Sequence, residues 1–567
     1  MPDLALILAT TGDKPSLGDW PYIVLALYLV ALLALGVIGL LKSKKAQHAE
    51  SDYYLAGRGQ GVIVTALTIM ATYFSGFAIL TFPGWMYEGG IAPMLYALNL
   101  PVAAAAIFLL GNRIRKIGRK RGYITPADMI TDYYGNSHVI RGLVALSGAL
   151  YVIPYVIMQI KAGGLLADGL FREVDEVPIF GGISMEDTGV AALSLVTMIY
   201  VIIGGMRSVA WTDVMQGVIL LSAMVLSGFA IMYALQGPGN FFARVSAELD
   251  GHLLTVPDRG ASYEVDGSKL GLPHNAWKIM TFCAFASLAS IIQPSQWMRF
   301  YAARDSRTLR RSAIAFSTIL PVCFIFGVFL VGLGGRVLYD AQVLDGAIAL
   351  PDGSNKDQVL IHVIQDYFPE IFGAVGIVLV SLILVAVMAA SMSTADSNLH
   401  ALSAVATRDV YKPLRPKSTE AERTWVGRLV IVLATVVAAV ITFAGKGGLL
   451  NTITAFFFLA MAFSAQLLPI TIDLLFLRRG SKAGAIAGLA AGLLTVCLFP
   501  PLGNLLIDDL LLGGEKSAFV SGTGNLKSLF DVGMCGIIVN VLIFALVSKF
   551  TKKPDQSHRE AFANDLR

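Results

Sequence analysis

Charged residues are scarce in this chain of 567 residues, of which Asp, Glu, Lys and Arg make up only 14%. A soluble protein carries about 25% of these residues. Here 56% of the residues are hydrophobic and the mean hydropathy is +0.69. Most of the surface must therefore face lipid, which excludes a large soluble domain. We expect a lipid bilayer as the surroundings of the chain and no nucleic acid as its partner.

Cysteine and histidine are also scarce. The four cysteines, Cys283, Cys323, Cys497 and Cys535, lie in or beside apolar runs and form no CxxC motif. We interpret them as small core residues and not as metal ligands or a disulfide framework. The seven histidines include no closely spaced pair, and no nucleophile stands in a recognisable arrangement with a base. The sequence therefore predicts that the protein is not an enzyme.

What the sequence has in abundance is long hydrophobic runs. A membrane-spanning helix needs about 20 predominantly apolar residues, and thirteen segments meet that requirement. The sequence therefore predicts an all-α polytopic membrane protein with about 13 transmembrane helices. The predicted spans are residues 21–41, 61–84, 91–111, 139–169, 188–205, 212–236, 277–298, 312–338, 371–407, 425–445, 450–477, 483–499 and 529–549.

The basic residues predict the orientation of these spans. If the N-terminus lies outside, alternate loops fall inside, and these inside segments hold 31 of the 43 lysines and arginines. Basic residues concentrate in cytoplasmic loops. Thirteen spans then place the N-terminus outside and the C-terminus inside. We expect a multi-pass protein of the inner or plasma membrane.

The order of the spans predicts an inverted repeat once the first span is set aside. Five spans then begin inside and the next five begin outside, which is the geometry of transporters whose site lies between broken helices. Ser75-Gly76 and Pro83-Gly84 interrupt the first helix of one set, and Gln293-Pro294-Ser295 interrupts that of the other. Ordinary kinks are the alternative interpretation. The expected organisation is an N-terminal segment with an extra span (1–60), two five-helix repeats (61–236 and 277–477), two C-terminal spans (478–550) and a cytoplasmic tail (551–567).

A stripe of hydroxyl groups interrupts the apolar run near residue 390. Ala390, Ser393, Thr394 and Ser397 are spaced to share one helix face. Such oxygens, facing free carbonyls of another helix, favour a site for a small hard cation. Alternatively, the hydroxyls bond to their own helix or join two helices together.

Three of the ionisable residues within predicted spans stand out. Asp396 lies beside the hydroxyl stripe, and a charge in a span usually marks an ion path or a paired charge. Asp213 opens its span and is either a second such group or an N-cap at the membrane surface. Lys161 either extends toward the outer interface or meets a substrate carboxylate.

Four ordered motifs give the chain a resemblance to the sodium:solute symporter family, which includes proline, pantothenate, sugar and sialic acid symporters. The resemblance runs from about residue 20 to about residue 500. It is carried by residues 52–58 (DYYLAGR), 204–217 (GGMRSVAWTDVMQG), 293–305 (QPSQWMRFYAARD) and 393–397 (STADS).

The resemblance implies the inverted five-plus-five fold and a sodium site between the first and eighth core spans. Its ligands would be the carbonyls of Ala71, Phe74 and Ala390 and the hydroxyls of Ser393 and Thr394. A candidate second ion would lie at Asp213, Asp396 and Ser397, although Asp396 stands where some two-ion members have serine.

The resemblance also implies a substrate beside the break in the first core span. The expected lining residues are Tyr73, Ser75, Gly76, Phe77, Ala78, Gln159, Lys161 and Gln293. Ala78 stands where sugar transporters of the family have glutamine, and Lys161 favours an anion. We therefore expect sodium-coupled import of a small carboxylate or amino acid. Proton coupling, a transporter-like membrane sensor, and a sugar or sialic acid as substrate are the alternatives.

Overall fold

The computed structural model describes residues 18–43, 49–170, 176–177, 182–257, 262–265, 268–271, 275–344, 347–444, 453–527 and 530–566. Within these residues ten helices are long and apolar enough to cross a membrane, and two further helix pairs do so if each bent pair counts as one span. One shorter apolar helix, α21, covers Lys482–Leu498. Each predicted span overlaps one of these segments.

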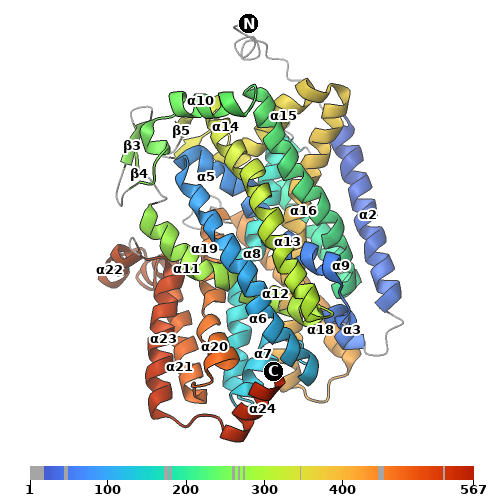
Figure 1. Cartoon of the computed structure of the whole chain (residues 1–567), viewed down its shortest axis with the longest axis vertical. Helices are drawn as coiled ribbons and strands as arrows, with labels where there is room; N and C mark the ends of the chain where they lie inside the picture. The colour runs from blue at the N-terminus through green and yellow to red at the C-terminus, as the bar shows by residue number, and fades with distance from the viewer. Residues whose placement is uncertain are drawn as a thin grey trace.

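The helices are bundled side by side, as Figure 1 shows. The first half contains α2 (Trp20–Ser43), α3 (Ala49–Leu55), η1 (Ala56–Arg58), α4 (Val62–Tyr73), η2 (Phe77–Thr81), α5 (Phe82–Gly89), η3 (Ala92–Leu98), α6 (Asn99–Arg121), α7 (Pro126–Tyr133), α8 (His138–Leu170), α9 (Met185–Ala234), α10 (Pro238–Glu248) and η4 (Gly251–Leu253).

The second half continues with α11 (Ala276–Ile292), α12 (Pro294–Ala302), α13 (Ser306–Phe324), η5 (Ile325–Leu330), α14 (Val331–Leu338), η6 (Lys356–Gln358), α15 (Val359–Phe372), α16 (Ala374–Val405), η7 (Ala406–Tyr411), α17 (Lys412–Leu414), α18 (Glu420–Ala444), α19 (Ile453–Ala465), α20 (Leu468–Ile472), η8 (Asp473–Leu477), α21, η9 (Asn504–Leu511), α22 (Ala518–Lys527), α23 (Val532–Phe550) and α24 (Gln556–Leu566). Three two-stranded hairpins complete the described part: β1 (Glu176–Val177) with β2 (Ile183–Ser184), β3 (Ser262–Val265) with β4 (Ser268–Gly271), and β5 (Gln342–Leu344) with β6 (Ala347–Ala349).

Two helices are broken where the sequence predicts interruptions. α4 ends at Tyr73, Phe74 leaves the helical region at φ −90° and ψ 79°, and the chain resumes after a 61° bend. α11 and α12 meet at a 51° bend, where Gln293 is extended at ψ 149°. Gln293 precedes Pro294, and the proline ring disfavours helical dihedrals in the residue before it. Pro83 and Gly84 do not interrupt the helix, because they lie within the first turn of α5.

A single glycine separates two predicted spans inside α9. Gly205 has φ +60° within a segment that is otherwise continuous from Met185 to Ala234. A β-carbon at Gly205 would lie 2.7 Å from the Tyr53 ring. The position therefore needs glycine both for its backbone conformation and for the close approach of α3.

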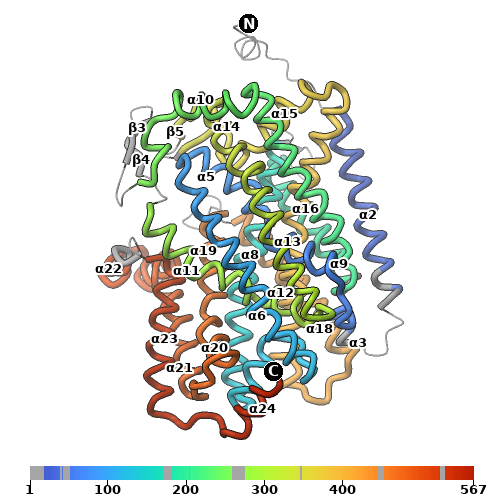
Figure 2. Tube along the Cα trace, in the orientation of Figure 1, coloured from blue at the N-terminus to red at the C-terminus, as the bar shows by residue number. Residues whose placement is uncertain are grey.

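Elements that are predicted to lie on the same side of the membrane are found at the same end of the molecule. Figure 1 places α10, the β3–β4 hairpin and α15 at the upper end, and α3, α7 and α24 at the lower end. The first group follows spans predicted to end outside, and the second lies in segments predicted to be inside. Figure 2 shows α2 along one flank of the bundle and α21 with α23 along the opposite flank.

The predicted polar tail forms a docked helix. Phe562 of α24 is fully buried, with its ring centroid 5.0 Å from that of Tyr133. The Arg121 guanidinium lies over the Phe562 ring, 4.8 Å from its centroid. Asp565 bridges Arg121 at 2.6 Å and Lys120 at 2.5 Å. α24 therefore fastens the lower ends of α6 and α7 to each other.

We predict that Phe562→Ala releases α24 from this surface. Truncating a buried phenylalanine lowers the free energy of unfolding by about 3–5 kcal/mol. This loss exceeds the stabilisation that exposed ion pairs provide. Hydrogen exchange of residues 556–566 in detergent should rise strongly. Phe550→Ala, at a position that is 75% exposed on α23, serves as the control and should leave the exchange unchanged. Equal exchange of the α24 amides in Phe562→Ala and the wild type would contradict the anchoring role.

Candidate functional site

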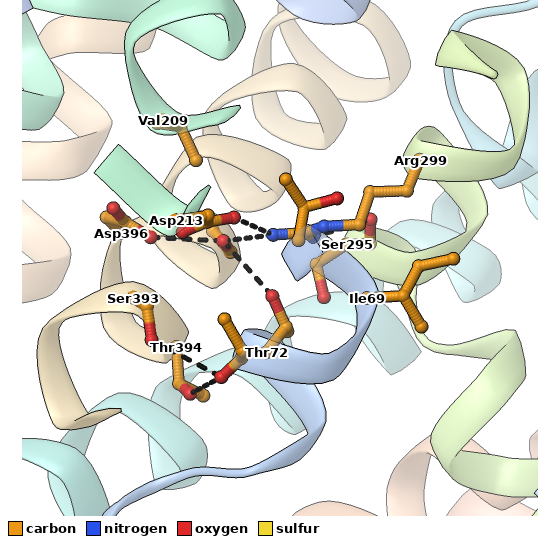
Figure 3. Close-up of polar contacts among 12 residues, drawn as sticks. Ile69, Thr72, Val209, Asp213, Ser295, Arg299, Ser393, Thr394 and Asp396 are labelled. Carbon is orange, nitrogen blue, oxygen red and sulfur yellow. Dashed lines mark hydrogen bonds and ion pairs between the residues drawn. The ribbon is translucent and has the colours of Figure 1, made fainter. Parts of the chain in front are cut away.

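Hydroxyl groups of α16 meet the broken end of α4. Ser393 Oγ donates to the Ala71 carbonyl at 3.3 Å, and Thr394 Oγ1 lies 3.4 Å from the same oxygen. The two hydroxyls also reach the Ala390 carbonyl at 3.1 and 3.0 Å. Figure 3 shows Ser393 and Thr394 beside Thr72 at this junction. The hydroxyls therefore bond to their own helix and join two helices at once.

The Ala71 carbonyl is available because α4 stops. Carbonyls in the last turn of a helix lose their intrahelical partners, and Ala71 lies two residues before the end of α4. Phe74, the first non-helical residue, follows directly. Oxygen atoms of this kind are the ligands that hard cations prefer. All four converging oxygens, from Ala71, Ala390, Ser393 and Thr394, are neutral, so these groups carry no formal charge.

A second, charged cluster adjoins the first. Arg299 of α12 pairs with Asp213 of α9, its Nη2 lying 2.9 Å from Oδ2, and both side chains are almost fully buried. The same nitrogen donates to Ser397 Oγ. Asp213 is thus an ion-paired group in the protein interior, which excludes the interfacial N-cap interpretation.

Asp396 completes this cluster. Its Oδ1 accepts from Ser397 Oγ at 3.0 Å, and its Oδ2 accepts from Tyr200 OH at 2.7 Å. Thr72 Oγ1 lies 3.4 Å from Ser397 Oγ, which links the charged cluster to the broken end of α4. Figure 3 shows Asp213 and Asp396 on the side of the Arg299 head group opposite its backbone. Three elements far apart in the sequence therefore share one buried polar centre.

No conventional metal centre accompanies these clusters. Throughout the described residues, no group of three or more His, Cys, Asp and Glu side chains could hold a metal ion. The four cysteines are free.

A small cavity lies beside both helix breaks. Its volume is about 40 Å³, enough for a few water molecules. Four of the predicted lining residues, Tyr73, Phe77, Ala78 and Gln293, contribute to its wall. The rest of the wall is formed by residues that were not predicted, namely Phe82, Asn99, Tyr155, Phe282, Ala286, Ser290, Phe324, Phe457 and Met461.

Ser75, Gly76 and Gln159 lie behind this wall. The Gly76 amide donates to Gln159 Oε1 at 3.0 Å, and a β-carbon at Gly76 would lie 2.4 Å from Ser391 Oγ. Gly76 therefore lets the broken helix pack closely against α8 and α16. Ser75 and Gln159 are buried at the same junction, and neither lines the cavity.

Lys161 is also absent from the cavity wall. Its ammonium group attracts the buried carboxylate of Asp357 in η6, which accepts from Thr81 Oγ1 at 2.9 Å. Burial raises the pKa of Asp357 above its usual range, and Lys356 and Lys161 oppose that rise. Lys161 is thus within electrostatic reach of η6, in the connection between α14 and α15.

The sequence interpretation missed the aromatic half of the cavity. Phe457 of α19 stacks on Phe77 with ring centroids 3.8 Å apart and planes at 9°. Tyr155 of α8 lies nearby, and Tyr73 OH donates to Asn99 Oδ1 at 2.7 Å. Phe457 belongs to a run of three phenylalanines whose composition matches any lipid-facing helix. Only the packing of α19 against α8 distinguishes it.

The chain matches known proteins over most of its length. The family model for the sodium:solute symporter family matches residues 53–492. A sodium/proline symporter of Staphylococcus aureus (strain Newman) is 26% identical over 570 aligned positions, covering 97% of this chain and 96% of the relative.

Two solved structures share the fold. A sodium-coupled sialic acid symporter in a substrate-bound outward-open state has a TM-score of 0.69 and 20% identity, covering 95% of this chain and 99% of that one. A nucleobase-cation-symport-1 family transporter in a closed conformation has a TM-score of 0.52 and 14% identity, covering 90% and 98%. The chain has enough apolar helices for a multi-pass plasma-membrane protein. Because the family model matches well over half of its length, this chain belongs to the sodium:solute symporter family.

Proposed function

We propose that this transporter imports a small carboxylate or amino acid together with sodium by alternating access. The observation that carries the proposal is the meeting of the Ser393 and Thr394 hydroxyls with the Ala71 carbonyl at the break in α4. A cation bound there would hold α4 to α16. Its binding would therefore depend on how these two helices are placed.

In this proposal sodium is bound by the carbonyls of Ala71, Phe74 and Ala390 and the hydroxyls of Ser393 and Thr394. A neutral oxygen cage suits a monovalent ion that must also leave. Burial of all five residues supports the site, because a dry environment strengthens ion–dipole attraction. Phe74 is included among the proposed ligands because it lies just beyond the end of α4.

The substrate is proposed to occupy the cavity between the two helix breaks. Phe77, Ala78 and Gln293 lie at the starts of the resumed helical segments, and helix N-termini favour anionic groups. Aromatic walls from Tyr155 and Phe457 suit an apolar body. Similarity to a sodium/proline symporter supports an amino acid.

The proposed topology has thirteen crossings, with the N-terminus outside and the C-terminus inside. Residues 61–236 and 277–477 form two inverted five-helix repeats, which the paired bends of 61° and 51° support. Sodium then enters from the side where it is abundant. The membrane potential adds about 2.3 kcal/mol per charge per 100 mV to the driving force.

Proton coupling is the second candidate. Arg299 pairs with Asp213, and Ser397 links the same guanidinium group to Asp396. One negative charge therefore remains if both carboxylates ionise, and a proton could neutralise it. A sialic acid substrate is favoured only by the fold shared with a sialic acid symporter. A sensor role has no sequence feature in its favour, and the names of the family and its members indicate a transporter and not an enzyme.

We predict that Ser393→Ala and Thr394→Ala each raise the sodium concentration for half-maximal stabilisation about tenfold, which corresponds to about 1.4 kcal/mol. Each change removes one oxygen from the proposed cage. Thermal unfolding of purified protein over a sodium titration, with choline keeping the ionic strength constant, measures the shift.

Ser381→Ala is the matched control, because Ser381 is a buried serine of the same helix that bonds only within it, to the Ile377 carbonyl at 3.0 Å. Its midpoint should equal that of the wild type. Wild-type uptake in proteoliposomes that is unchanged when choline replaces sodium would refute sodium coupling.

We predict that Phe457→Ala weakens solute binding about tenfold while the sodium midpoint without solute stays the same. The change removes the ring stacked on Phe77, and aromatic pairs contribute about 0.5–1.5 kcal/mol beyond burial. A screen of carboxylates, amino acids and sugars, each added with saturating sodium, identifies the solute by its extra stabilisation. Phe229→Ala, at a position 54% exposed, is the control. A normal solute response in Phe457→Ala would move the substrate site elsewhere.

A further inference from the structure

We propose that the Arg299 guanidinium is a resident cation at the place of the candidate second ion, so that the transporter binds one sodium ion per cycle and not two. The inference rests on the proposed sodium-coupled function and specifies its stoichiometry. The sequence predicted a candidate second ion at Asp213, Asp396 and Ser397. The structure brings all three together, and a side chain from α12 lies among them.

The head group of Arg299 contacts two of the three residues of the candidate second-ion site, and Ser397 links it to the third, Asp396. Nη2 lies 2.9 Å from Asp213 Oδ2 and donates to Ser397 Oγ, while Nη1 donates to the Ser295 carbonyl at 3.1 Å. These oxygens come from α9, α16 and α12. Figure 3 shows the dashed contacts from α9 and α16 converging on the Arg299 head group. One positive charge thus links three helices at this point.

Ser397 has no bonding capacity left for a second cation. A hydroxyl group offers one hydrogen and two acceptor positions. Ser397 Oγ donates to Asp396 Oδ1 at 3.0 Å, and it accepts from Arg299 and, at 3.4 Å, from Thr72 Oγ1. To bind sodium, the serine would have to lose one of these two donors.

The charge of Arg299 is permanent and buried. Arginine is not deprotonated in proteins, and this side chain is 1% exposed. A sodium ion at Asp213 would have to lie a few ångströms from the guanidinium, in a region where the repulsion is screened little. A tethered cation also cannot be released inside, so it contributes no charge to transport.

The two clusters are therefore assigned different roles. The cluster of Ser393 and Thr394 contains only neutral oxygens, and a cation can enter and leave it. The cluster of Asp213 and Ser397 carries its own cation. The competing interpretation is that Arg299 and Asp213 are an ion pair that only holds the fold. The two interpretations predict different numbers of bound sodium ions when Arg299 is replaced by a neutral residue.

The test is direct binding of ²²Na⁺ to the purified full-length protein in detergent, without solute. We expect saturation at one sodium per chain and a Hill coefficient near 1 in the wild type. Ser393→Ala should weaken this binding about tenfold, as in the thermal titration. In Arg299→Gln, Asp213 is left without its cation, and we expect a second sodium per chain. Arg299→Gln with Asp213→Asn should return the count to one.

Arg304→Gln is the matched control, since Arg304 lies five residues further on with a side chain 64% exposed, and it should bind one sodium like the wild type. Two sodium ions per wild-type chain would overturn the resident-cation inference and leave symport intact. A folded Arg299→Gln that still binds one sodium would overturn it as well. No sodium bound by the wild type would instead refute the proposed function. If Arg299→Gln fails to fold, the wild-type count alone decides between one ion and two.

Discussion

The break in α4 is the constraint on which the rest of the site depends. Within a membrane, a backbone carbonyl that loses its helical partner must find another one inside the protein. The Ala71 carbonyl finds the hydroxyls of Ser393 and Thr394, and this need ties the broken helix to α16. The same break turns Phe77 and Ala78 toward the cavity and lets Gly76 approach Ser391. The proposed ion ligands, the cavity wall and the close helix packing thus arise from one interruption of helical hydrogen bonding.

This arrangement explains how an ion and a solute can depend on each other without touching the same atoms. A ligand shifts a conformational equilibrium only through its different affinity for the two states. The carbonyl of Ala71 and the ring of Phe77 lie on either side of the same break, so a movement that separates α4 from α16 alters both sites. The second break, at Gln293, contributes to the cavity wall and leads into the helix that carries Arg299. Both polar clusters and the cavity are therefore built on the two broken helices and their neighbours.

The helix breaks and the hydroxyl cluster could be predicted from the sequence, since helix interruptions and a hydroxyl stripe are local features. Ser75-Gly76, Gln293-Pro294 and the spacing of Ser393 and Thr394 can be found within a few residues of chain. Contacts between distant helices have no such signal. The pairing of Arg299 with Asp213 joins α12 to α9, and the stacking of Phe457 on Phe77 joins α19 to η2. Lys161 shows the same limit, because its attraction to Asp357 depends on how the connection before α15 is placed in the folded chain. In helices that are apolar on every side, periodicity does not reveal which face meets which neighbour.

The contrast between the two polar clusters follows from the energetics of buried charge. Removing an ion from a neutral oxygen cage leaves hydroxyls that can bond to carbonyls again, as Ser393 and Thr394 do with Ala390 and Ala71. Removing a cation from beside Asp213 would leave a buried carboxylate uncompensated, which is strongly unfavourable. A transported ion therefore suits the first cluster, since its departure costs little. A covalently tethered guanidinium suits the second, because the charge that Asp213 requires is then present in every conformation in which Arg299 can reach it.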